Sequence, residues 1–236
     1  MVMGNFDYLE KNLSEILRTI KEMEEKYQRS ITLVCVTKSG SDEELLELAK
    51  LGAIHIGENR PSELVRRGGL LRAEGYSPVL HQIGHLQRNK VKLVIGIADF
   101  IHSIDSIPLA EELNKQAQKL GIRICALIEI NSAMEESKGG IDPDTAEGFY
   151  LELKKLDHID VVGIMTMGPA LEDKELVRPY FRKTKEIFDK INARYGFAGE
   201  PILSMGMSES YMIAIEEGAN LVRVGRRLFE KRQDKE

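Results

Sequence analysis

Short apolar, β-rich runs alternate with amphipathic helical patterns along almost the whole chain, and no other sequence feature constrains the fold as strongly. The runs lie at residues 31–38, 53–57, 79–84, 100–104, 122–130, 161–167, 201–205 and 221–224. Most intervals carry a helical pattern, such as residues 107–120, 145–156, 175–195 and 211–217. Short apolar strands separated by helices are typical of a parallel sheet that is buried on both faces. The alternation therefore predicts an α/β protein.

The number of strand-and-helix units limits the choice of architecture. Eight strand-and-helix units favour a closed (β/α)8 TIM barrel, and an open doubly wound sheet is the alternative. A further amphipathic helix is predicted near the N-terminus from the helical spacing of Phe6, Leu9, Leu13, Ile16, Leu17 and Ile20. Because no break in composition divides the chain, we expect one domain over residues 1–236. Its N-terminal helix, within residues 1–30, packs on the barrel, and residues 230–236 form a polar tail.

Composition excludes several classes of protein. The chain has 33 basic and 38 acidic residues and a net charge of −5, which disfavours a nucleic-acid partner. Cys35 and Cys125 both lie in apolar runs and are expected to be buried free thiols in a reducing compartment. The N-terminus lacks the apolar core of a signal peptide, and no apolar stretch is long enough to cross a bilayer. A cytoplasmic protein without a membrane partner is expected.

In a barrel of this type the working face lies at the carboxyl ends of the strands, and Lys38 closes the first predicted strand. A lysine that points into a barrel mouth is partly desolvated, which lowers the pKa of its ammonium group and favours Schiff-base chemistry. The alternative is a lysine whose stem packs on the rim while its ammonium group stays in water.

Two further features lie at the same predicted rim. The segments Ser204–Ser208 and Gly225–Arg226 follow the seventh and eighth strands, where such barrels usually bind phosphate. The alternative is a pair of ordinary turns, with Ser208 capping a helix. Arg223 lies inside an apolar strand and needs a partner, for which the sequence offers Glu129 or Asp105.

Histidine spacing gives a weaker signal. His81 and His85 are four residues apart, which would place them on one face of a strand. No third ligand follows at metal-binding spacing, so no metal site is expected.

Seven short segments, in order along the chain, resemble one family. They are Leu33–Lys38, Ile56–Asn59, His81–Gln87 with Asn89 and Lys90, Ser137–Gly139, Gly163–Pro169, Leu203–Ser208 and Val222–Gly225. Together they are similar to the pyridoxal phosphate homeostasis proteins, a YggS-like family related to the N-terminal domain of alanine racemase. The resemblance runs from residue 31 to about residue 229. It implies a TIM barrel of the alanine racemase N-terminal type.

The resemblance also implies a cofactor and roles for particular residues. Lys38 would hold pyridoxal 5′-phosphate (PLP) as a Schiff base, and Asn59 would lie near its ring. The hydroxyl groups of Ser204 and Ser208 and the backbone of Gly225 and Arg226 would hold the phosphate. Arg223 would face the pyridine nitrogen.

The sequence departs from the family pattern at three places. Arg226 stands where a threonine is usual, Leu80 replaces an aromatic residue, and Arg60–Ser62 replace a different triplet after Asn59. The first departure removes one hydroxyl from the expected phosphate site.

The expected function follows from the same resemblance. Racemases on this barrel carry a second, β-rich domain with an opposing tyrosine, and this chain ends at Glu236 directly after the barrel, so neither is expected in cis. An arginine donates to the ring nitrogen without protonating it, which leaves a poor electron sink. We therefore expect a PLP-binding homeostasis protein that buffers or delivers PLP, as a monomer or a weak homo-oligomer, with apo forms of PLP-dependent enzymes as recipients. The alternatives are a racemase of low activity and a Schiff-base aldolase acting on a sugar phosphate.

Overall fold

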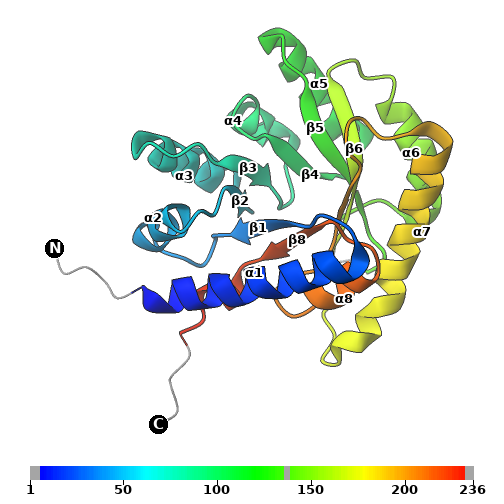
Figure 1. Ribbon diagram of the computed structural model, residues 1–236. Coiled ribbons are helices and arrows are strands. Elements are labelled where there is room, and N and C mark those ends of the chain that lie inside the picture. Colours follow the sequence, from blue (N-terminus) through cyan, green and yellow to red (C-terminus); the bar gives the residue numbers. More distant parts are fainter. Residues whose placement is uncertain (1–5, 136–138, 232–236) are drawn as a thin grey trace.

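Eight parallel strands close into a barrel in chain order, with β8 pairing back onto β1 (Figure 1). A computed structural model describes residues 6–135 and 139–231, and the strands are those found within these ranges. Closure into a barrel excludes the open sheet. The strands are β1 (Thr32–Val36), β2 (His55–Glu58), β3 (Val79–Gln82), β4 (Phe100–Ile104), β5 (Ile124–Ile130), β6 (Ile159–Thr166), β7 (Ile202–Ser204) and β8 (Leu221–Val224).

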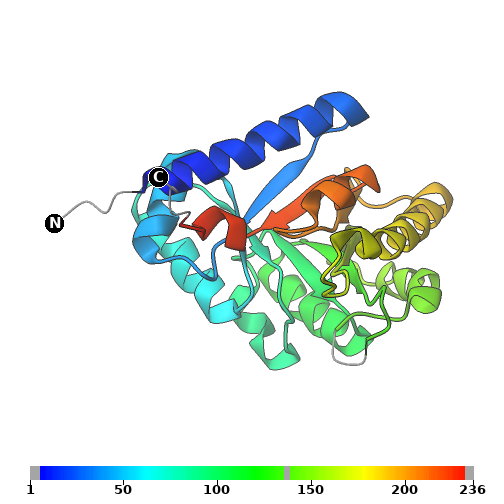
Figure 2. The ribbon, with the colours of Figure 1, turned by 90° about the horizontal axis from the view of Figure 1, so that it is seen from below.

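Helices connect the strands and surround the barrel (Figure 2). They are α1 (Asp7–Tyr27), α2 (Asp42–Lys50), α3 (Pro61–Ala73), α4 (Val91–Val94), α5 (Ile107–Leu120), α6 (Ala146–Leu153), α7 (Arg178–Tyr195), α8 (Tyr211–Glu216) and α9 (Arg226–Phe229). Short 3-10 helices cover Arg88–Lys90, Pro143–Thr145 and Lys174–Val177. The predicted fold class is therefore confirmed. Ser137 and Lys138 of the Ser137–Gly139 motif, and residues 232–236 of the predicted polar tail, lie outside the described residues.

The expected N-terminal helix is α1, which packs on the outside of the barrel. Its buried face carries Leu9, Leu13, Ile16, Ile20 and Met23. The Asn12 side-chain amide donates to the carbonyl oxygens of Leu228 and Glu230, both at 2.9 Å, and so ties α1 to the last helix. Leu17, which the helical spacing also assigned to the apolar face, is 46% exposed.

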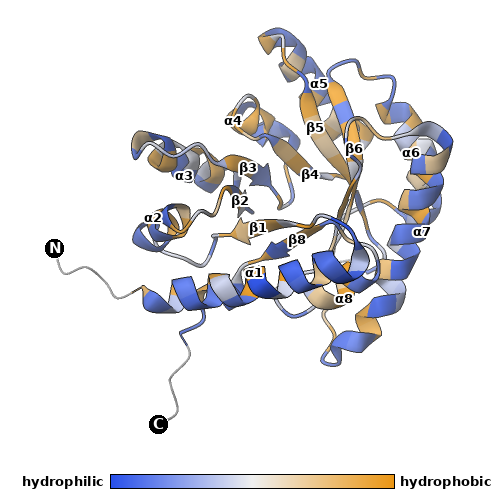
Figure 3. Ribbon diagram, in the orientation of Figure 1, coloured by the Kyte–Doolittle hydropathy of each residue, from blue (hydrophilic) through white to orange (hydrophobic). Residues whose placement is uncertain are grey.

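The hydrophobic core lies mainly between the strands and the helices, and the helices turn charged faces outward (Figure 3). A smaller apolar cluster of Leu127, Val162 and Met165 packs with Phe100 and Ile202. Figure 3 also shows hydrophilic segments within β3 and β8, which carry His81, Gln82 and Arg223.

The structure shows the state of the two cysteines and the character of the helices, both of which were predicted from the sequence. Cys35 and Cys125 are free thiols, Cys35 buried and Cys125 half-buried. None of the helices formed by the described residues has the length and apolar character needed to cross a bilayer.

Candidate functional site

A cavity of about 460 Å³ opens at the carboxyl ends of the strands. It is lined by residues that follow β1, β2, β3, β6 and β7 and by residues of β8 and its loop. Its volume falls in the range of about 300–1,000 Å³ that is usual for small-molecule sites. The cavity brings together six of the seven predicted site residues, namely Lys38, Asn59, Ser208, Arg223, Gly225 and Arg226.

Lys38 lies in a turn beyond the end of β1, and its side chain is exposed. The strand ends at Val36, two residues earlier than the sequence suggested. The desolvation that the sequence prediction assumed for Lys38 is therefore not observed, because the side chain is exposed in the turn at the rim. The lysine does line the cavity, so its position, rather than burial, makes it available to a ligand.

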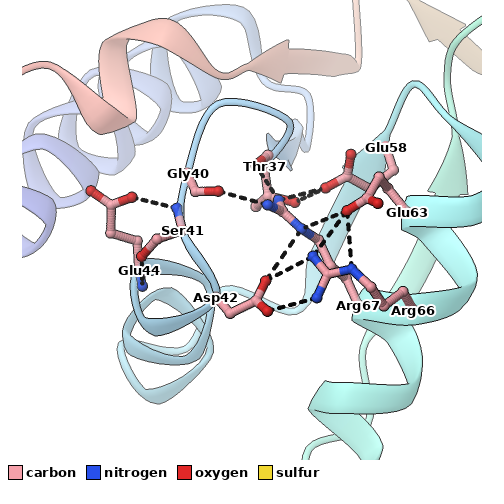
Figure 4. A network of polar contacts seen from close by, with 9 residues as sticks. All are labelled: Thr37, Gly40, Ser41, Asp42, Glu44, Glu58, Glu63, Arg66 and Arg67. Carbon is pink, nitrogen blue, oxygen red and sulfur yellow. Dashed lines mark hydrogen bonds and ion pairs between the residues drawn. The ribbon is translucent and has the colours of Figure 1, made fainter.

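Buried Arg67 of α3 clamps the backbone on both sides of the Lys38 turn (Figure 4). Its guanidinium donates to the carbonyl oxygen of Thr37 and, at 2.6 Å, to that of Gly40. The same guanidinium pairs with the Glu58 carboxylate at 2.8 Å, which also accepts the Thr37 hydroxyl at 2.6 Å. Sequence reasoning missed Arg67 because a charged residue in an amphipathic helix is usually solvated.

The turn leads directly into α2, whose N-terminus is closed by a reciprocal capping pair. The Ser41 hydroxyl accepts from the Glu44 backbone N–H at 3.2 Å, and the Glu44 carboxylate accepts from the Ser41 N–H at 2.6 Å (Figure 4). This reciprocal pair satisfies two backbone donors at the helix start. The Lys38 turn is thus fixed by Arg67 on one side and by a capped helix on the other.

Arg223 is 3% exposed and forms part of the cavity wall. Its Nη1 donates to Ser204 Oγ at 2.6 Å, and its Nη2 donates to the carbonyl oxygen of Thr166 at 3.0 Å. Within the described ranges no ion pair joins it to Glu129 or Asp105, the two partners that the sequence offered. Burial lowers the pKa of Arg223 to about 10, which Glu129 partly opposes, so the side chain stays positive at neutral pH.

Ser204 does not lie where the sequence prediction put it. It is fully buried, it is not among the residues that line the cavity, and its hydroxyl is engaged with Arg223 and with His102. The physical reason is strand alternation: Ser204 is the last residue of β7 and points into the barrel interior, rather than belonging to the loop that follows. The expectation that Ser204 supplies a hydroxyl to a phosphate site is thereby corrected.

Ser208, Gly225 and Arg226 form one corner of the cavity. Ser208 Oγ accepts from the Gly225 N–H at 3.2 Å and from the Arg227 N–H at 3.4 Å. A Cβ atom at Gly225 would lie 2.9 Å from the carbonyl oxygen of Val36, so only glycine allows β8 to leave the barrel this close to β1. The corner therefore carries the Ser208 hydroxyl, to which two backbone N–H groups donate, and the guanidinium of Arg226.

Asn59 also lines the cavity and directly follows β2. Its carbonyl oxygen accepts from the Gln82 side chain at 3.0 Å. A Cβ atom at Gly84 would lie 2.4 Å from the same oxygen, so this glycine lets the chain after β3 pass close to Asn59.

His81 and His85 do not share a face, contrary to the spacing argument. His81 is buried in β3, whereas His85 follows the end of that strand, is 62% exposed, and lies 3.4 Å from Asp105. The described residues contain no cluster of three or more histidine, cysteine or carboxylate side chains that would hold a metal ion.

A barrel with a lysine after its first strand and a polar corner after its last two strands is the arrangement that defines a class of protein domains. Residues 11–232 match the family model described as the alanine racemase N-terminal domain. The chain is 38% identical to the pyridoxal phosphate homeostasis protein of Aquifex aeolicus over 94% of this chain and 98% of that protein. It is 31% identical to the protein of the same name from Helicobacter pylori over 95% and 99% of the two chains. The chain belongs to the pyridoxal phosphate homeostasis protein family.

A solved structure of PipY from Synechococcus elongatus, described as having PLP bound, shares the fold. The identity is 25%, the TM-score is 0.83, and the match covers 94% of this chain and all of that one (100%).

Proposed function

We propose that this chain binds PLP, holds it on Lys38 as a Schiff base, and buffers or delivers it without strong turnover of its own. The observation that carries the proposal is one shared cavity, lined by the Lys38 amine, the Arg223 guanidinium and the Ser208–Gly225 corner. PLP offers an aldehyde, a pyridine nitrogen and a phosphate, so each of these three groups has a partner of matching chemistry. The PLP-bound PipY structure and the names of the relatives support the same cofactor.

In this proposal the phosphate lies at the corner between the loops after β7 and β8. The Ser208 hydroxyl and the backbone N–H groups of Gly225 and Arg227 already converge there. The guanidinium of Arg226 lines the same cavity and adds positive charge where the family usually has a threonine hydroxyl. Ser204 has no part in this corner, and Asn59, which lines the same cavity, lies near the ring.

Arg223 supports binding without strong turnover. The two partners of its guanidinium, Ser204 and Thr166, hold it in the cavity wall, and its charge persists at neutral pH. A guanidinium donates a hydrogen bond to the pyridine nitrogen but keeps its proton. Bound PLP supplies an electron sink, and this sink is weak when the ring nitrogen stays unprotonated.

We propose that the barrel with α1 acts as one PLP-binding domain, a monomer or weak homo-oligomer, and that apo forms of PLP-dependent enzymes receive the cofactor. The two free thiols agree with the reducing cytoplasm as its compartment.

The experiment is to add PLP to the purified protein, reduce with borohydride, and locate the modified lysine by peptide mapping. We expect the label on Lys38 and loss of the bound-cofactor absorption in Lys38→Ala. Lys174→Ala is the matched control, because Lys174 lines the same cavity and its side chain contacts the carbonyl oxygen of Leu171. Label on Lys174, or on Lys138 outside the described residues, would overturn the assignment of Lys38.

A further inference from the structure

A chain of hydrogen bonds between polar side chains crosses the interior of the barrel and ends on Arg223. His55 Nδ1 lies 3.0 Å from His81 Nε2, and His81 Nδ1 lies 2.9 Å from His102 Nε2. His102 Nδ1 in turn lies 3.2 Å from Ser204 Oγ, which accepts from Arg223 Nη1 at 2.6 Å. This series of hydrogen bonds starts at the first residue of β2 and passes through β3, β4 and β7 to β8.

This series of hydrogen bonds is unusual because the inside of such a barrel is normally filled with branched apolar side chains. His81, His102 and Ser204 are fully buried. The His81 ring also stacks on Phe100 at 4.9 Å between ring centroids, which fixes its plane. Buried polar groups are retained at a cost unless every donor and acceptor is paired.

All three imidazoles are held neutral. Burial lowers the pKa of His81 to about 3, and burial, His81 and Arg223 together hold the pKa of His102 well below its usual value. Burial also lowers the pKa of His55, against the nearby Asp99 carboxylate, which raises it. A neutral imidazole donates from one nitrogen and accepts at the other, so every bond along the chain must run in the same direction.

Arg223 sets that direction, because a guanidinium only donates. With one lone pair of Ser204 Oγ taken by Arg223, the hydroxyl proton is free to point at His102 Nδ1. His102 then carries its proton on Nε2 and donates to His81, and His81 donates from Nε2 to His55. In the reverse direction His102 would donate to an oxygen that already accepts from a cation, and the Ser204 proton would lose its acceptor on the chain.

We infer that His55, His81 and His102 are positioning residues for Arg223, acting in series as Nε2–H imidazoles that keep the Ser204 oxygen turned toward its guanidinium. Each dipole in the series then presents its negative end toward the cation. The series thereby does for Arg223 what a paired carboxylate would do, although Glu129 faces it without an ion pair. The role of Arg223 toward the cofactor rests on the proposed function, whereas the hydrogen-bond chain belongs to the cofactor-free protein as well.

The test is made first on cofactor-free protein with ¹⁵N-labelled histidine, using long-range ¹H–¹⁵N correlation spectra that distinguish the two tautomers. We expect His81 and His102 to be neutral with the proton on Nε2. Ser204→Ala removes the donor to His102 and should abolish its single-tautomer pattern, whereas Ser204→Thr should retain it. Ser103→Ala is the matched control, because it removes a buried hydroxyl from the residue next to His102, one that donates to Gly84 instead.

A proton on Nδ1 of His102 in the wild-type protein, or an unchanged His102 pattern in Ser204→Ala, would overturn the inference. The second arm measures PLP binding, where Ser204→Ala should lose affinity by about tenfold, the size expected for a charged hydrogen bond, and Ser103→Ala should lose less. Altered tautomers with wild-type affinity would refute the positioning role. If the wild-type protein bound no PLP but showed the inferred tautomers, the proposed function would fail and the hydrogen-bond chain would stand.

Discussion

Arg223 carries its charge in the barrel wall with two uncharged hydrogen-bond partners, Ser204 and Thr166. Its electrostatic surroundings are set by Glu129, whose pKa is raised to about 7 by burial and by Asp105 and is held down in part by Arg223 itself. A residue at position 223 therefore controls both the charge that faces the cavity and the protonation of a neighbouring carboxyl group.

We predict that Arg223→Glu changes the reactivity of bound PLP. A carboxyl group at this position can share a proton with the ring nitrogen, which strengthens the electron sink, so deuterium exchange at the α-carbon of an added amino acid should become faster than in wild type. Affinity for PLP should fall by about 1–3 kcal/mol, the size of a lost charged hydrogen bond, so the comparison is made at saturating PLP.

Arg223→Gln is the control, since it removes the charge without supplying a carboxyl group. It should lose affinity and gain no exchange activity. Equal exchange rates in wild type and Arg223→Glu at saturation would show that residue 223 does not govern the ring nitrogen.

At the scale of elements, the turn between β1 and α2 is held by α3 through a buried ion pair. Arg67 and Glu58 have side chains that are 8% and 1% exposed, and between them they satisfy Thr37 and the carbonyl oxygen of Gly40. Removal of one partner leaves the other charge buried and unpaired, which typically costs about 3–5 kcal/mol.

We predict that Arg67→Ala lowers the melting temperature by roughly 10 °C, given about 2–4 °C per kcal/mol for a chain of this size, and slows borohydride trapping of PLP on Lys38. Arg66→Ala, one residue away, is the control. The side chains of its ion pairs with Asp42 and Glu63 are 35–47% exposed, and such surface pairs contribute about 0–1 kcal/mol. A similar small effect of both substitutions would contradict the clamp.

The elements themselves were readable from the sequence because strands buried on both faces appear as apolar runs. The predicted helix over residues 107–120 matches the bounds of α5 in the structure. The errors lie at strand ends, where one residue decides between barrel interior and rim. For this reason Ser204, at the end of β7, faces the barrel interior, and Lys38 lies in a turn beyond the end of β1.

Side chains that pair across the barrel were not predictable in the same way. His55 and His102 were passed over because a single histidine in an apolar strand carries no signal of its partner. The distances in sequence along the chain are 26 residues from His55 to His81 and 102 residues from His102 to Ser204. The strands β2 and β3 are hydrogen-bonded neighbours, whereas only closure of the barrel brings β4 and β7 to face each other across its interior.

Taken as a whole, the molecule buries titratable groups of opposite behaviour in one barrel. His81 has a folded pKa of about 3 against an ordinary value of 6.5, so below pH 6.5 the unfolded chain takes up a proton that the folded chain does not. Glu129 has a folded pKa of about 7 against 4.5, so between these values the folded chain holds a proton that the unfolded chain releases. Acidification therefore destabilises the fold through His81 and stabilises it through Glu129.

We predict that two substitutions tilt the pH dependence of stability in opposite directions. The slope of the free energy of unfolding changes by ~1.4 kcal/mol per pH unit for each group that titrates in only one state. In His81→Gln the free energy of unfolding should fall less on acidification below pH 6.5, because the unfolded state no longer gains a proton at that position. In Glu129→Gln the free energy of unfolding should fall more steeply as the pH decreases from about 7 to 4.5, because the folded state no longer takes up the stabilising proton at that carboxyl group.

Urea unfolding of the wild type and both variants between about pH 5 and pH 8 measures these slopes. Any uniform loss of stability from the substitutions shifts a curve without changing its slope. Three parallel curves would mean that neither group is buried in its uncharged form, and the neutral histidine series beneath Arg223 would then lose its basis.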